Sequence, residues 1–130
     1  MRRETYTNFL TALSQSHSNM RAATLRTTPT EAERLGILYT AIDESGIWRM
    51  RQCLSLCAPA EIIELAVAAA DALVVMQDAL VATFDTTSDA YVHARTDLWA
   101  ANAELREAMR KDLGGSGPPD PELSRYRHPS

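Results

Sequence analysis

Residues 60–84 carry the pattern that most limits what this chain can fold into. Apolar residues recur there at steps of three and four positions, at Ile62, Ala66, Ala69, Leu73, Met76, Leu80 and Phe84. At about 100° per residue, these positions stay on one face of an α-helix. Acidic residues repeat every seven positions on the opposite face, at Glu64, Asp71, Asp78 and Asp85. The stretch therefore predicts a long helix packed in a bundle, with an acidic ridge toward solvent.

Three further helices are expected from similar patterns. The first spans residues 3–26 and places Phe9, Leu13 and His17 on its inner face. The second spans residues 30–56, begins with a capping box from Thr30 to Glu33, and has an apolar face made of Leu35, Leu38, Tyr39 and Ile42. The last spans residues 89–113, and Gly114 suits the left-handed position that ends many helices.

Gly46 lies inside the second of these helices. Glycine in a helix interior costs about 1 kcal/mol relative to alanine. After Gly46 the apolar face also rotates, because Ile47, Met50, Leu54 and Cys57 do not continue the row before it. We expect one helix with a kink near Gly46, and a true break into two helices is the alternative.

Four helices with short connections favour an all-α fold, an antiparallel up-down four-helix bundle, over residues 1–114. The expected core comprises Phe9, Leu13, Leu38, Ile42, Ile62, Leu73, Leu80, Leu98 and Leu105. Residues 115–130 are rich in glycine and proline and have no apolar periodicity, so we expect a disordered tail.

Charge and cysteine content exclude several classes of protein. The net charge is −4, and no basic residue occurs between Arg51 and Arg95, so a nucleic-acid partner is not expected. Two cysteines fit a reducing cytoplasm, and the N-terminus lacks the apolar segment of a signal peptide. Acidic residues interrupt helix 60–84, and each would cost about 2.5–3.5 kcal/mol near a bilayer centre. We therefore predict a cytoplasmic protein with no membrane partner.

Three segments resemble a known group of proteins. They are Glu44-Ser45-Gly46-Ile47-Trp48-Arg49-Met50-Arg51-Gln52, the junction Leu56-Cys57-Ala58-Pro59-Ala60-Glu61-Ile62, and the ending Leu105-Arg106-Glu107-Ala108-Met109-Arg110-Lys111-Asp112-Leu113-Gly114. The chain is similar here to small helical proteins of unknown function that are common in high-GC actinobacterial genomes. The resemblance implies a helical fold and a cytoplasmic origin, and it implies no activity, cofactor or site.

No arrangement of residues indicates catalysis or metal binding. Cys53 and Cys57 share one helical face, where we expect them to be small buried apolar residues. His93 and Asp97 are also one turn apart, but they fall on the outer face of their helix with no nucleophile nearby. We expect no enzyme activity, no cofactor and no metal.

His17 and Asn102 are the polar residues predicted to lie near the inner seams. Each is expected to be a core residue satisfied by one partner, and the two could face one another. The alternative is a pocket near His17, Asn102 and Gly46, which would make the protein a small-molecule binding or sensing bundle.

Helix 60–84 is apolar over more than one face, because Val67, Val74, Val75 and Val81 lie beside the acidic ridge. Either this helix is central in the monomer, or its second face contacts another protein. Trp48 beside Arg49 and Arg51 resembles an interface anchor, although burial after Gly46 is the alternative. We predict a non-enzymatic helical interaction protein that self-associates or binds another protein.

Overall fold

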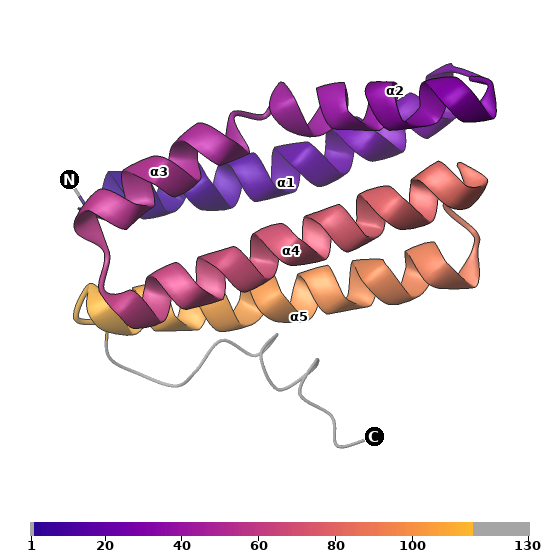
Figure 1. The fold of residues 1–130 in the computed structure, drawn as a ribbon. Helices are drawn as coiled ribbons and strands as arrows, with labels where there is room; N and C mark the ends of the chain where they lie inside the picture. Colours follow the sequence, from indigo (N-terminus) through magenta and orange to yellow (C-terminus); the bar gives the residue numbers. More distant parts are fainter. Residues whose placement is uncertain (1, 116–130) are drawn as a thin grey trace.

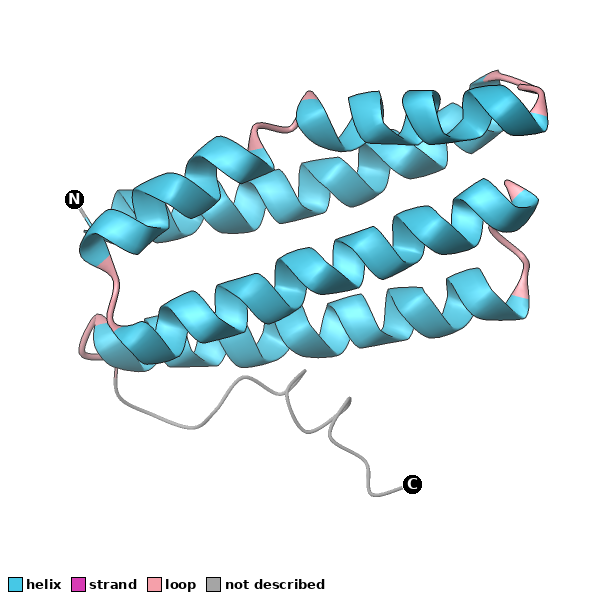
Figure 2. Cartoon of the chain, viewed as in Figure 1, coloured by secondary structure: helices cyan, strands magenta, loops and turns pink. Residues whose placement is uncertain are grey.

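The computed structural model describes residues 2–115, which form five helices. They are α1 (Arg2–Arg26), α2 (Glu31–Asp43), α3 (Ile47–Cys57), α4 (Ala60–Thr83) and α5 (Asp89–Asp112). Figure 2 shows helices joined by short loops, with no strand among these residues. The all-α prediction is therefore confirmed for the part of the chain that the structure describes.

The helices lie alongside one another in long rows (Figure 1). α1 lies next to α2 and α3, which follow each other nearly in line, and α4 lies next to α5. α2 also packs on α4, whereas contact between α1 and α5 is sparse. The start of α1 and the end of α5 meet, since an Arg2 nitrogen lies 3.1 Å from Asp112 and the Tyr6 hydroxyl donates to the same carboxylate.

The core runs along the middle of these rows. Every residue predicted for it is buried, namely Phe9, Leu13, Leu38, Ile42, Ile62, Leu73, Leu80, Leu98 and Leu105. Burying such a side chain contributes about 1.5–3 kcal/mol. These core residues come from α1, α2, α4 and α5, so their packing fixes how the four helices face one another. α3 contributes Ile47 and Leu54 to the same core.

The prediction of one kinked helix over residues 30–56 is wrong. α2 ends at Asp43 and α3 begins at Ile47, so the segment is broken into two helices, which was the alternative. Gly46 has a φ of 76°, which is left-handed and cannot continue a right-handed helix. The Ser45 hydroxyl donates to the Ile42 carbonyl and accepts from the Ile47 amide, which stabilises the turn.

α1 packs its own polar side chains against this break. The Ser16 hydroxyl is fully buried and lies 2.7 Å from the Ser45 hydroxyl. Asn19 donates to the Ala41 carbonyl in the last turn of α2. Carbonyls near a helix end lack intrahelical partners, so Asn19 supplies one of the missing hydrogen bonds.

The other helix ends follow the expected chemistry with one exception. The capping box is present, since the Glu33 carboxylate accepts from the Thr30 amide at 2.9 Å. Ser88 caps α5 by accepting from the Tyr91 amide, and Gly114 is left-handed with a φ of 81°. α4 ends at Thr83 rather than at Phe84, because Phe84 itself is left-handed, with a φ of 52°.

α4 has the length and composition of a membrane span, and it is the one described helix that does. The central helix of a soluble protein meets the same criteria, and eight residues of α4 are buried against the other helices. The predicted disordered tail lies outside the described residues, apart from Gly115.

Candidate functional site

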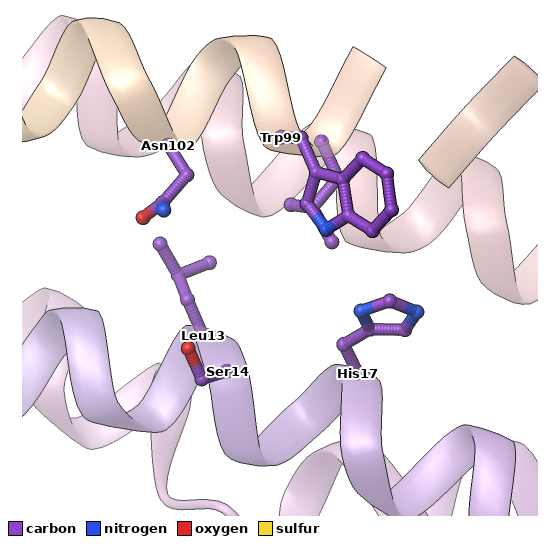
Figure 3. A pocket seen from close by; sticks show the side chains of 6 residues that line it. Leu13, Ser14, His17, Trp99 and Asn102 are labelled. Carbon is purple, nitrogen blue, oxygen red and sulfur yellow. The ribbon is translucent and has the colours of Figure 1, made fainter. Parts of the chain in front are cut away.

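A small cavity opens between α1 and α5, where contact between the helices is sparse. Its volume is about 40 Å³, and its walls are Leu13, Ser14 and His17 from α1 and Leu98, Trp99 and Asn102 from α5. Figure 3 shows the Trp99 ring and the His17 imidazole reaching toward each other from opposite helices. One buried water needs about 10–15 Å³ of such space, so the cavity has room for a few water molecules.

His17 and Asn102 thus lie on the wall of the same cavity. The hydrogen-bond partner of His17 is Tyr91, whose hydroxyl lies 2.8 Å from Nε2 of the imidazole. Tyr91 is fully buried, and its ring is tilted against the imidazole with 6.2 Å between the centroids. This bond ties the middle of α1 to the first turn of α5.

The surroundings of His17 disfavour its protonated form. Burial is the largest cause, and the positive charges of Arg21 and Arg95 act in the same direction. Together they lower the pKa of His17 to about 4. Burial also raises the pKa of Tyr91, against the opposing effect of the same two arginines. Both groups are therefore neutral at pH 7, and the imidazole is able to accept a hydrogen bond from the Tyr91 hydroxyl.

Gly46 does not belong to this cavity, contrary to the predicted pocket. It lies instead in a separate surface hollow of about 370 Å³ beside α1, with Gln15, Arg49 and Met50 among the lining residues. A second hollow, of about 330 Å³, continues from the cavity along α1 and α5 and shares Ser14 and Asn102 with it. Hollows thus lie on both flanks of α1, against α5 on one side and against α2 and α3 on the other.

The valines predicted as an interface divide into two groups. Val67, Val74 and Val75 are exposed on α4, whereas Val81 is partly buried against the core. Trp48 is also partly buried against the core, and the Arg51 guanidinium lies 5.7 Å from its ring centroid. The role of the four valines and of Trp48 in a protein contact stays a prediction.

Two apolar residues of α2 are exposed against expectation. Leu35 and Tyr39 were predicted to share the inner face with Leu38 and Ile42, and only the latter pair is buried. Asn19 and Ile37 line one hollow with Ala41, which places Ile37 and Ala41 on the α1 side of α2. Leu35 and Tyr39 are rotated about 160° from these residues and therefore lie on the flank of α2 away from α1.

The prediction of two buried cysteines is wrong. Cys53 is exposed, and Cys57 is only partly buried. The break at Gly46 sets the orientation of α3, and its deeply buried positions are Ile47 and Leu54, two turns apart. Cys53 immediately precedes Leu54 and is therefore rotated about 100° toward solvent.

The remaining titratable pair is on the surface, as predicted. His93 and Asp97 are both exposed, with 3.9 Å between the imidazole and the carboxylate. Among residues 2–115, no group of three or more His, Cys, Asp or Glu side chains is placed to hold a metal ion.

Comparisons with family models, with curated proteins and with solved structures gave no match to this chain. The resemblance to small actinobacterial helical proteins therefore stays a prediction. The site rests on its own geometry.

Sequence reasoning missed the role of Arg95. Tyr91, Arg95 and Trp99 are spaced by four residues on α5, and the Arg95 guanidinium lies 5.9 Å and 4.8 Å from the two ring centroids. Aromatic residues one turn before and after an arginine are the signal that could have found this stack.

Proposed function

We propose that the protein is a non-enzymatic, cytoplasmic helical interaction protein that self-associates through the apolar surface along α2 and α4. One observation carries the proposal: exposed aliphatic and aromatic side chains gather on adjoining helices. We define this α2–α4 surface as Leu35, Tyr39, Val67, Val74 and Val75.

The exposed fractions show that these side chains are accessible to solvent and are not part of the core. Leu35 and Tyr39 are 52% and 57% exposed, and Val67, Val74 and Val75 are 37%, 38% and 54% exposed. Single exposed apolar residues are ordinary, but several of them on adjoining helices mark a contact site in many proteins. Covering these five side chains would recover part of their burial free energy.

The two rows of the surface adjoin because α2 packs on α4. An Arg34 nitrogen of α2 donates to the Val81 and Ala82 carbonyls at the end of α4, at 3.1 Å and 3.0 Å. Val67, Val74 and Val81 are seven residues apart, so they follow one side of α4. Leu35 is next to Arg34, and Tyr39 is one turn farther along the same flank of α2.

We also infer the finer fold from this arrangement. The four long rows support an antiparallel up-down bundle in which α2 and α3 together take the place of one helix. The cytoplasmic location is supported by the two cysteines, which form no disulfide.

A metabolite-binding bundle has less support. Pockets for metabolites are typically about 300–1,000 Å³ and largely enclosed. The cavity with His17 and Asn102 on its walls is about 40 Å³. It accommodates waters or a very small group only.

The test is the mass of the protein in solution, by light scattering after size exclusion over a wide concentration range. We expect a dimer or larger species that Val74→Asp dissociates, because a charge on the surface would be buried without a partner. The matched control is Val92→Asp, which makes the same substitution at a valine of α5 that is also 38% exposed and lies outside the surface. A strict monomer at the highest concentration would contradict self-association.

A further inference from the structure

The outer face of α5 is buried at two positions where no described helix lies. Ala103 is 0% exposed and Glu107 is 5% exposed. Both are rotated by roughly 140–180° from the core-facing Leu98 and Leu105. Of the described helices, only α4 and α1 contact α5, and they do so from the core side (Figure 1). A further segment of polypeptide is therefore needed to cover Ala103 and Glu107.

The chain leaves α5 on this same face. Gly114 is left-handed, and the Gly115 amide donates to the Arg110 carbonyl at 2.9 Å, which completes a Schellman turn. A Cβ added to Gly115 would lie 2.7 Å from Cγ of Arg110, so the Gly115 backbone packs directly on that side chain. Arg110 is about two turns from Ala103, and one of its nitrogens donates to the Glu107 carboxylate at 2.6 Å. The residues after Gly115 therefore begin beside the covered positions.

This face continues along the helix as a strip with an aromatic ring. We define the α5 strip as Trp99, Ala103 and Arg110, which follow one flank of α5 because they are four and seven residues apart. The Trp99 side chain is 38% exposed. Arg95 adds a positive charge beside the ring, since its guanidinium lies 4.8 Å from the Trp99 centroid. The strip thus offers an accessible indole, a small residue and a neighbouring cation.

Residues 116–122 have a composition that suits such a strip. Their sequence is Ser-Gly-Pro-Pro-Asp-Pro-Glu. Prolines favour the polyproline II conformation, and segments in that conformation dock on exposed aromatic rings with little loss of entropy. The charged residues of the segment, Asp120 and Glu122, are both acidic. They are therefore complementary to the guanidinium of Arg95.

The reach of the segment matches the positions of these groups. A polyproline II segment advances about 3.1 Å per residue, whereas an α-helix rises about 1.5 Å per residue. Trp99 lies about 16 Å back along α5 from the point where the chain leaves the helix. A segment that runs back along α5 from Gly115 therefore places residues 119–121 level with Trp99. It places Glu122 level with Arg95.

We propose that residues 116–122 dock in extended form along the α5 strip of the same chain, with their prolines on Trp99 and Glu122 paired with Arg95. The docked segment covers Ala103. Because Trp99 also lines the α1–α5 cavity, the segment lies at the edge of that cavity. The contact uses no residue of the α2–α4 surface, so it does not depend on the proposed self-association.

The experiment is limited cleavage of the full chain by a glutamate-specific protease that cuts after Glu122. Mass spectrometry follows the fragment that begins at Leu123. Cleavage at this bond requires the undocked state, so its rate reports the undocked population. We expect Trp99→Ala to raise the rate about fivefold or more, because the ring that holds the prolines is lost. Tyr39→Ala is the matched control, since it removes an exposed aromatic ring from α2, and it should leave the rate unchanged.

A second measurement changes only the segment and leaves every helix as it is. In a Trp48→Phe protein, Trp99 is the single tryptophan, and acrylamide quenching of its fluorescence reports how accessible the ring is. Replacing Pro119 and Pro121 together by glycine should raise the quenching constant about 1.5-fold or more, because the docked prolines exclude solvent from the ring. Tyr126→Ser lies beyond the docked residues and should leave the constant unchanged.

Each outcome decides the proposal. Faster cleavage in Trp99→Ala, or stronger quenching in the double proline variant, supports docking when the matched control is unchanged. Protection that disappears on dilution would place the segment on the strip of a second copy, and this would overturn the contact within one chain. Equal cleavage rates together with equal quenching constants in all the proteins would overturn docking itself.

Discussion

At the scale of single residues, His17 connects burial to pH. Its pKa is lowered from 6.5 to about 4 by burial, Arg21 and Arg95. The unfolded chain therefore takes up a proton between pH 6.5 and pH 4 that the folded protein does not. The stability contributed by the neutral imidazole is complete above pH 6.5 and is lost as the pH falls toward 4.

We expect this loss to be about 2 kcal/mol in the free energy of unfolding, allowing for the partial exposure of His17. The measurement is urea unfolding of the parent protein and of His17→Gln between pH 4 and pH 7. As the pH falls, the free energy of unfolding of the parent protein should decrease relative to that of His17→Gln. His93→Gln is the control, because that imidazole is exposed, and a parallel pH dependence in all three proteins would contradict the assignment.

At the scale of elements, the break between α2 and α3 depends on the backbone of Gly46. A Cβ added there meets nothing within 4 Å, so crowding does not oppose a side chain. The φ of 76° does oppose it, because L-residues rarely adopt the left-handed conformation. Gly36 presents the contrasting case, since it lies within α2 and an added Cβ there also meets nothing within 4 Å.

Gly46→Ala and Gly36→Ala should therefore change stability in opposite directions. Gly46→Ala should lower the free energy of unfolding by about 1 kcal/mol, and Gly36→Ala should raise it by about 0.5–1 kcal/mol. Denaturant unfolding of both variants under one set of conditions is the measurement. If Gly46→Ala were neutral or stabilising, residues 44–46 would be able to rejoin α2 and α3 into one helix.

α3 shows how such a break affects its neighbours in the chain. Cys53 and Cys57 were expected to be buried with Leu54, but the orientation of α3 places only Ile47 and Leu54 deep in the core. Trp48 is partly buried by the same orientation. The break thus decides which side chains of residues 47–57 are available to solvent.

At the scale of the whole molecule, self-association couples stability to protein concentration. If two copies bury the α2–α4 surface on each other, the unfolding midpoint should rise with concentration, because mass action favours the folded assembly. Val74→Asp should remove this dependence, while Val92→Asp should keep it. Scanning calorimetry over a range of concentrations measures it, and a concentration-independent midpoint in the parent protein would argue against a stable assembly.

The acidic ridge bears on how two copies can meet. Asp71 and Asp78 are exposed on α4 beside Val74 and Val75. Two α4 helices packed directly on each other would bring these carboxylates together, which is unfavourable. We therefore expect two copies to meet with their acidic ridges offset from each other, or to make contact through Leu35 and Tyr39 of α2.

The sequence alone determined where most helices lie and which residues form the core. Spacings of three and four residues placed Phe9, Leu73 and Leu105 inside, and the structure confirms them, because helical periodicity is a local property of the chain. The tertiary structure decided that Leu35 and Tyr39 are exposed and that His17 meets Tyr91, with Arg95 held over the tyrosine ring. These outcomes depend on which helices pack together and at what rotation, and that is set by contacts between residues far apart in the chain. For Gly46 the sequence placed the irregularity, but the contacts that surround the turn, from Ser16 and Asn19 of α1, are visible only in the folded protein.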